Sequence, residues 1–183
     1  MKNILKIAAA FLVLAFPVAG MAEDENLISN GDFEKGSGWA DDWGQPKTGA
    51  TLEKENDNHF VRLASGKAGE QILLYKAIQV PAGVKSFELS FRIRVQNLKP
   101  GKEPWFDARV VNNFKDESGE AYPGPPPVYY RKDTKDWVEK KIKFNAPEGA
   151  TKLEFIAGLF QVESGTLDVD DIVLKPGDSG SFK

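Results

Sequence analysis

The sequence predicts an all-β protein, built as an antiparallel β-sandwich or jelly roll. Apolar and polar residues alternate in several short segments, which is the pattern of half-buried strands. Turn-forming residues separate these segments, and no stretch has the apolar spacing of an amphipathic helix. Many short strands joined by turns are typical of sandwiches and jelly rolls. The 183-residue chain is long enough for one such domain with a proper core.

The chain begins with the pattern of a bacterial secretory signal peptide. Lys2 and Lys6 precede an apolar run over Ile7–Phe16, and Gly20-Met21-Ala22 supplies the small residues that signal peptidase requires. The run is too short to span a bilayer. We therefore expect a signal peptide over residues 1–22, cleavage after Ala22, no membrane insertion, and a secreted or periplasmic protein.

Composition excludes several function classes. The chain has 24 basic and 27 acidic residues, and this mildly acidic balance argues against a nucleic acid as partner. It has no cysteine, so disulfides, thiolate chemistry and a lipid anchor on cysteine are excluded. Because His59 is the only histidine, we expect neither a Ser-His-Asp triad nor a multi-histidine zinc site.

Strands are expected along the whole remaining chain, and the clearest is Phe87–Val95 ("FELSFRIRV"), in which apolar and polar residues alternate without a break. The same alternation predicts strands over 106–110, 137–144 and 167–173, and weaker patterns predict Leu27–Ser29, Phe60–Ala64, Ile72–Val80 and Leu153–Val162. A proline-rich loop with three tyrosines covers Lys115–Tyr130. We place the sandwich at 26–175 and a flexible tail at 176–183.

One carboxylate near the end of the chain is predicted to point inward. Asp171 shares its phase with Leu167, Val169 and Val173, which places it toward the core. A buried carboxylate must be protonated, paired with a cation or bound to a metal. The strand arginines all lie on the polar phase, so an interior salt bridge is not the expected solution: Arg62, Arg92, Arg94 and Arg109.

A calcium ion is the expected solution, since calcium takes about six to eight oxygen ligands. Asp32 and Glu34 flank Phe33 near the start of the domain. A calcium joining Glu34 to Asp171 would tie the first strand to the last. The alternative is that Asp170 and Asp171 end an edge strand in solvent and that Asp32 forms a turn.

Three segments together resemble a known group of domains. "NLISNGDFEKGSGW", "FELSFRIRV" and "APEGATKLEF…GTLDVDDIVL" are similar to the jelly-roll carbohydrate-binding modules of families four and nine, which have the galactose-binding-domain-like fold. The resemblance covers Asn26 to about Lys175. It implies a polysaccharide or glycan as partner. It also implies a structural calcium near Glu34 and the pair Asp170 and Asp171. As carbonyl donors to this ion we expect Asp32 and the Lys54–Asn56 region.

Candidate ligand-binding residues come from aromatic and polar positions on outward phases. Aromatic rings beside a few convergent polar groups mark sugar-binding sites. We expect them on one sheet face, with two tyrosines from the proline-rich loop closing one side: Arg92, Arg94, Trp105, Asp107, Arg109, Tyr129 and Tyr130. The alternative is that the charged members are ordinary cross-strand ion pairs. Trp39 and Trp43 are further candidates, or they cover one end of the core.

The expected function is therefore a non-catalytic, exported carbohydrate-binding protein. As a lone module it would work beside a partner glycoside hydrolase or an envelope protein. The alternative is an envelope or extracellular structural sandwich that contacts proteins and no longer binds sugar. A glycosidase needs two carboxylates facing each other across a cleft, and no strand has closely spaced acids in one phase, so we do not expect an enzyme.

Overall fold

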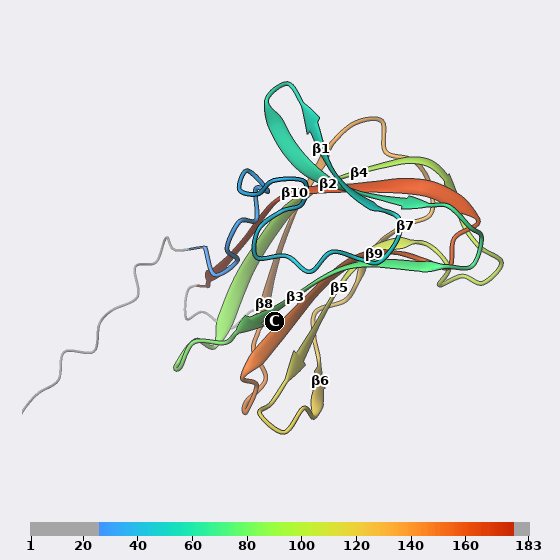
Figure 1. Ribbon diagram of the computed structural model, residues 1–183. Helices are drawn as coiled ribbons and strands as arrows, with labels where there is room; N and C mark the ends of the chain where they lie inside the picture. The colour runs from blue at the N-terminus through green and yellow to red at the C-terminus, as the bar shows by residue number, and fades with distance from the viewer. Residues whose placement is uncertain (1–25, 178–183) are drawn as a thin grey trace, which may run out of the picture.

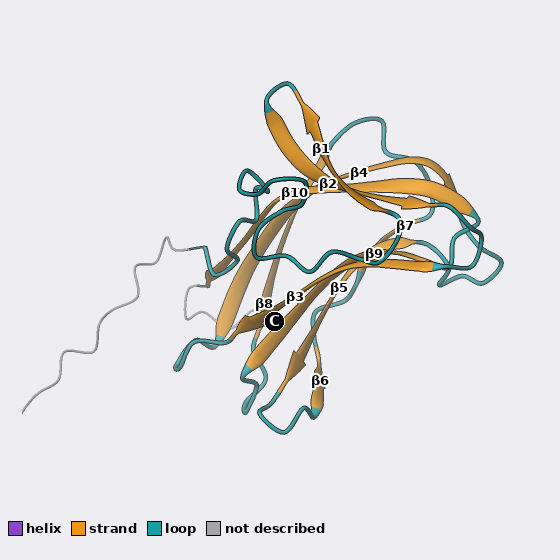
Figure 2. Cartoon of the chain, in the orientation of Figure 1, coloured by secondary structure: helices purple, strands orange, loops and turns teal. Residues whose placement is uncertain are grey.

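The computed structural model describes residues 26–177 and consists of two antiparallel sheets packed face to face (Figure 1; Figure 2). The first sheet has the strand order β1-β2-β10-β4-β8, and the second has the order β3-β9-β5-β6 with β7 also paired to β5. The strands are β1 (Ala50–Glu55), β2 (Asn58–Ser65), β3 (Gln71–Gln79), β4 (Ser86–Lys99), β5 (Ala108–Lys115), β6 (Ala121–Pro123), β7 (Val128–Tyr130), β8 (Val138–Asn145), β9 (Lys152–Phe160) and β10 (Ser164–Pro176). This confirms the predicted all-β sandwich.

The predicted boundaries were close for most strands. The expected signal peptide over residues 1–22 and residues 178–183 of the expected tail lie outside the described residues. Three strands were missed, namely β1 and the two short strands that pair with β5 inside the proline-rich loop. Residues 26–177 contain no helix long and apolar enough to cross a membrane.

The core lies between the two sheets and is rich in phenylalanine. Phe87, Phe91, Phe114 and Phe155 are fully buried there, as the alternation in their strands predicts. Neighbouring rings contact one another edge to face or tilted, for example Phe91 and Phe155 at 6.2 Å between centroids. Each strand therefore has one buried and one outer face, and the outer faces carry the candidate functional residues.

The N-terminal segment runs along the last strand, although it does not form the predicted strand Leu27–Ser29. The Leu27 N–H donates to the Leu174 carbonyl at 2.8 Å, and the Ile172 N–H donates to the Gly31 carbonyl at 2.8 Å. The Asn26 side chain accepts the Leu174 N–H at 2.9 Å and donates to the Ile172 carbonyl at 3.0 Å. Side-chain bonds thus replace part of the strand ladder.

The same segment then inserts aromatic rings into the core. Phe33 is fully buried, and its ring lies 5.1 Å from that of Trp43. The Trp43 indole N–H donates to the Asn30 carbonyl at 2.8 Å. Lys76 of β3 donates to the carbonyls of Ser29 and Asp42, at 3.2 and 2.8 Å. The segment therefore connects β10 of the first sheet to β3 of the second.

A bulge in β10 overturns the predicted orientation of Asp171. Asp170 pairs with Arg92, and the next paired residue, Val173, pairs with Ser90. Asp171 and Ile172 therefore lie opposite the single residue Phe91 of β4, which is a β-bulge. Asp171 has a φ of 49° at this point. Ile172 takes the core position, and Asp171 faces outward, where it pairs with Arg92 at 2.8 Å.

Candidate functional site

Three large aromatic side chains are exposed, and two of them, Tyr75 and Tyr129, lie on the outer face of the second sheet. Tyr75, Trp105 and Tyr129 are 44, 57 and 65% exposed. Tyr75 lies on β3 beside the buried Leu74, and Tyr129 lies on β7 opposite Arg109, whose neighbours in β5 are buried. Both tyrosines therefore face outward. Trp105 lies in the loop before β5, and its carbonyl accepts a hydrogen bond from the outward Arg109.

The strand register shows how far apart the two tyrosines lie. Tyr129 is aligned through Arg109 and Gly158 with Leu73 of β3, and Tyr75 follows Leu73 by two residues. Three strand spacings and two residues along a strand correspond to a separation of about 16 Å between Cα atoms. The face is thus wider than a single sugar ring.

Aliphatic side chains form the floor between these aromatic residues. Val111 and Ile156 lie in the same row as Tyr75, and all three point outward. Gly158 leaves room for the Leu73 side chain, because a Cβ at Gly158 would lie 2.4 Å from the Leu73 Cδ2 atom. The centre of the face is therefore flat and apolar.

Glu154 is the polar centre of one side of this face. Its Oε1 atom accepts hydrogen bonds from the Tyr75 hydroxyl at 2.7 Å and from the Lys115 Nζ at 2.8 Å. Burial alone would raise the pKa of Glu154, but the bonds from Lys115 and Tyr75 outweigh it and leave the pKa lowered. Burial and the bond to Glu154 raise the pKa of Tyr75 to about 12. Glu154 is thus ionised near neutral pH and holds the Tyr75 ring in place.

Asp107 and Arg109 support the other side of the face. Asp107 is buried, and its Oδ1 accepts the Arg109 Nε–H at 2.6 Å. The Arg109 guanidinium lies 5.0 Å from the centroid of the Phe160 ring and also bonds the Trp105 carbonyl. These contacts fix the Arg109 guanidinium beside the Trp105 carbonyl, so the pair holds the backbone at Trp105 in place.

Two of the predicted ligand-binding residues, Arg92 and Arg94, lie on the opposite side of the molecule. They belong to β4, and although β5 follows β4 in the chain, the two strands belong to different sheets. Arg92 and Arg94 therefore do not share a face with Trp105, Asp107 and Arg109. The prediction was wrong because alternation shows which side of a strand is polar but not in which sheet the strand lies.

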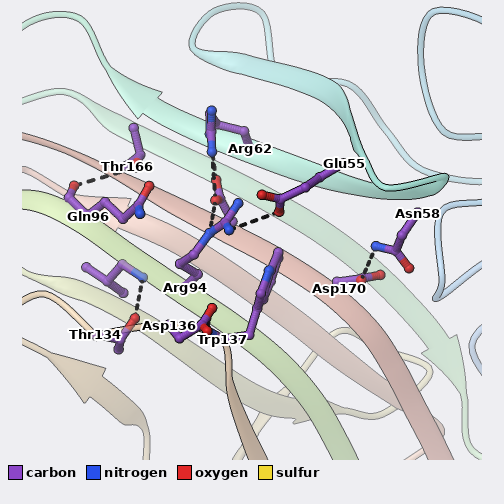
Figure 3. Close-up of polar contacts among 12 residues, drawn as sticks. Glu55, Asn58, Arg62, Arg94, Gln96, Thr134, Asp136, Trp137, Thr166 and Asp170 are labelled. Carbon is purple, nitrogen blue, oxygen red and sulfur yellow. Dashed lines mark hydrogen bonds and ion pairs between the residues drawn. The ribbon is translucent and has the colours of Figure 1, made fainter.

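Arg94 is part of an ion-pair cluster on the first sheet (Figure 3). The fully buried Asp168 accepts two bonds from Arg62, at 2.7 and 2.9 Å, and one from Arg94, at 2.9 Å. The Arg94 Nη1 also donates to Glu55 at 3.0 Å. An interior salt bridge therefore does occur in this protein, at Asp168 and not at Asp171, because Asp168 lies between two arginines of neighbouring strands. We call Asp168, Arg62, Arg94 and Glu55 the arginine–aspartate cluster.

Two aromatic rings cover this cluster. The Arg94 guanidinium lies 4.7 Å from the centroid of the Trp137 ring and 5.3 Å from that of the Phe60 ring, and the two rings contact each other edge to face. The Arg94 guanidinium thus bonds two carboxylates and contacts two aromatic rings, which gives it a role in stability.

Tyr130 also differs from its prediction. It pairs with the buried Ala108, and its side chain points toward the core. Its hydroxyl is buried and has no hydrogen-bond partner among the described residues. Burial raises the pKa of Tyr130 to about 12. Of the two neighbouring tyrosines, only Tyr129 belongs to the aromatic face.

The four predicted metal ligands lie around the bulge of β10 in two groups. Asp32 and Asp171 line one surface hollow of about 420 Å³. Glu34 accepts the His59 N–H at 2.7 Å and contacts the His59 Nδ1 at 2.8 Å. Asp170 is fully buried and accepts the amide of Asn58, the residue before His59, at 2.9 Å. Glu34 and Asp170 therefore contact two adjacent residues at the start of β2, His59 and Asn58 respectively. Figure 3 shows the bond between Asn58 and Asp170.

The alternative prediction, that Asp170 ends an edge strand in solvent, was wrong, because Asp170 is fully buried. Burial, the largest influence, raises the pKa of Asp170 to about 6. Within residues 26–177 it has no direct ion pair with a lysine or arginine. Within the same range, no three histidine or acidic side chains form a ready metal-binding group, so an ion here would need backbone carbonyls or water as well.

Comparison with known proteins identifies the architecture. No protein-family model matches the chain, and no curated protein matches its sequence. Solved structures do match. The enzymatically active domain of bacteriophage CBA120 tailspike protein 4 gives a TM-score of 0.63 at 17% identity, over 82% of this chain and 21% of that one. A family 16 carbohydrate-binding module gives 0.60 at 19% identity, over 81% of this chain and 99% of that one.

A third match is TmCBM61, solved in complex with β-1,4-galactotriose, with a TM-score of 0.56 at 14% identity, over 84% of this chain and 99% of that one. This chain spans about a fifth of the tailspike chain but nearly all of the two carbohydrate-binding modules. At these identities the likeness shows the fold alone. The fold is the β-sandwich found in carbohydrate-binding modules.

Sequence reasoning missed Tyr75 and Glu154. Both lie on strands with weaker alternation, and nothing in the sequence shows that β3, β9 and β5 are neighbours. The alternation of Ile72, Leu74 and Ile78 with Tyr75 was the available signal for an outward tyrosine.

Proposed function

We propose that the protein is a non-catalytic carbohydrate-binding protein that uses the outer face of its second sheet. The observation that carries this proposal is that Tyr75 and Tyr129 are exposed on the outer face of the second sheet, and that the exposed Trp105 lies on a loop bonded to Arg109 of the same face. Flat, exposed aromatic rings stack on the C–H surfaces of sugar rings, and a few polar groups beside them orient the ligand. Asn113, Lys115 and Glu154 supply such groups on the same face.

A polymer suits this face better than a single sugar. Tyr75 and Tyr129 are separated by about 16 Å, so a monosaccharide cannot contact both. A polysaccharide segment that crosses the strands can. Two of the matching structures are carbohydrate-binding modules, one of them solved with a β-1,4-linked trisaccharide, and these support the same class of ligand. Membership of the family four or nine type remains part of this proposal.

Affinity electrophoresis on a panel of plant, algal and bacterial polysaccharides tests the proposal. We expect at least one polysaccharide to retard the mature protein, and we expect Tyr75→Ala and Trp105→Ala to reduce the retardation. Arg92→Ala on the opposite sheet is the matched control and should bind as the parent does. If retardation is lost in Arg92→Ala but kept in both aromatic variants, the binding site lies on the first sheet and the proposal is refuted.

A protein partner is the second candidate. The aliphatic floor of Leu73, Val111 and Ile156 favours it, because apolar side chains in the centre of a flat face are typical of protein interfaces. In this case the chain would act as an envelope or extracellular interaction sandwich. No retardation on any polysaccharide, together with a specific protein partner lost in Ile156→Asp, would favour this candidate.

We propose a structural calcium between Glu34 and Asp170. A buried carboxylate with no direct cation partner in the described chain fits a hard cation, and Asp170 is such a group. Asp171 fits less well as a ligand because its carboxylate pairs with Arg92. We expect metal analysis to find bound calcium and a chelator to lower the melting temperature. An unchanged melting temperature and a metal-free protein would refute the site.

Export completes the proposal. The leader pattern supports cleavage after Ala22 and a secreted or periplasmic location, where the protein would act beside a glycoside hydrolase or an envelope protein. N-terminal sequencing of the protein recovered outside the cytoplasm should begin at Glu23.

A further inference from the structure

Trp105 is an exposed side chain on a loop whose backbone is unusually well held. The Arg131 Nη1 donates to the Glu103 carbonyl at 3.2 Å and to the Pro104 carbonyl at 2.6 Å. The Trp105 carbonyl accepts a hydrogen bond from the Arg109 Nη2. Three successive carbonyls are thus bonded by two guanidinium groups.

The side chain of Arg109 is held in place, and the chain next to Arg131 is anchored. Arg109 is held by the buried Asp107 and by the face of the Phe160 ring. Arg131 follows β7 directly, and two residues later the Asp133 carboxylate accepts the N–H groups of Asn97 and Leu98 in β4, at 2.9 and 2.8 Å. The loop that carries Trp105 is therefore connected to strands of both sheets.

These contacts do not bury the Trp105 ring, which stays 57% exposed. The same carbonyls could bond to water, so these exposed bonds add no more than about 1 kcal/mol to the stability of the domain. Holding the loop should affect ligand affinity more than stability, because ordering a loop and a side chain during binding costs affinity. A loop fixed in advance avoids that cost.

We propose that Arg131 is a positioning residue, which fixes the Trp105 ring as a rigid platform for the ligand. This inference rests on the proposed carbohydrate binding. Arg131 acts through the backbone at Glu103 and Pro104 and does not itself contact the sugar. Neither its sequence position nor its residue type marks it as part of the site.

The experiment measures ring mobility and affinity separately. In isotope-labelled protein, the heteronuclear NOE of the Trp105 indole N–H, assigned with Trp105→Phe, reports ring mobility without any ligand. The dissociation constant for the retarding polysaccharide is measured in the same variants. Arg131→Met removes the two bonds, Arg131→Lys keeps one donor group, and the exposed neighbour Lys132→Met is the matched control.

We expect Arg131→Met to lower the NOE of Trp105, to weaken binding about three- to tenfold, and to lower the melting temperature by no more than about 4 °C. Arg131→Lys should restore part of both effects, and Lys132→Met should behave as the parent. An unchanged NOE in Arg131→Met would refute the proposal that Arg131 holds the Trp105 ring. A lower NOE with unchanged affinity would refute the proposal that holding the ring strengthens binding. If the parent binds no polysaccharide, the proposed function fails and the binding role with it, while the NOE still decides whether Arg131 holds the ring.

Discussion

A substantial loss of stability on the first sheet is expected for Asp168→Asn. Asp168 is fully buried and accepts three hydrogen bonds, two from Arg62 and one from Arg94. The substitution keeps the shape of the side chain but removes its charge. It also turns an amide N–H₂ group toward two guanidinium groups, which can only donate.

The structure allows the size of this effect to be worked out. Breaking a buried ion pair from one side costs about 3 to 5 kcal/mol, because a charge is left buried without its partner. The Arg62 and Arg94 side chains are 30 and 11% exposed, so Arg62 can be partly hydrated, and Arg94 keeps Glu55. We therefore expect the lower end, about 3 kcal/mol, and a melting temperature lower by about 6 to 12 °C.

Urea unfolding followed by tryptophan fluorescence is the assay, with Asp171→Asn as the matched control. Asp171 forms a half-exposed pair with Arg92, and such pairs contribute less than about 1 kcal/mol. The control effect should also shrink in high salt, whereas the Asp168 effect should remain. If Asp168→Asn costs no more than Asp171→Asn, the cluster does not stabilise the sheet and our reasoning about its burial is wrong.

Three further substitutions test other parts of the structure. A Cβ at Gly31 would lie 2.0 Å from the Ile172 carbonyl oxygen, so Gly31→Ala should push the N-terminal segment off the last strand and cost about 1 to 3 kcal/mol in urea unfolding. Lys76→Met removes the charged bonds from β3 to the N-terminal segment, and we expect faster amide hydrogen exchange there with little change elsewhere. The pKa of Glu154 is lowered from 4.5 in the folded protein, so its charge stabilises the fold at pH values above 4.5. The stability difference between the parent and Glu154→Gln should therefore disappear as the pH falls through the lowered pKa of the folded state. A difference that persists at low pH would show that the substitution removes a packing contact and not a charge.

The sequence predicted the fold well because alternation is a local property. Phe87–Val95 could be identified as a strand from its own residues, and β4 contains it. The same rule failed at Asp171, where a bulge changes the phase within one strand. A bulge depends on how two strands pair, and local alternation contains no information about that pairing.

Some residues of the candidate site could be selected from the sequence, and others could not. Trp105 and Tyr129 could be selected from the sequence, because exposed aromatic residues in and beside loops are conspicuous. Tyr75 and Glu154 could not be joined to them, since β3 and β9 are distant in the chain from β5 and β7 and become neighbours only in the sheet. Arg92 and Arg94 were placed with Trp105 for the opposite reason: neighbours in sequence were taken as neighbours in space.

By itself, the amino-acid sequence determined that this chain forms strands, which residues of most strands enter the core, and that its first and last segments carry unusual polar residues. The tertiary structure decided which strands share a sheet, which carboxylate is buried against arginines, and which aromatic rings form one face. The physical reason is that alternation acts over two residues, whereas strand pairing is set by long-range packing of the whole core.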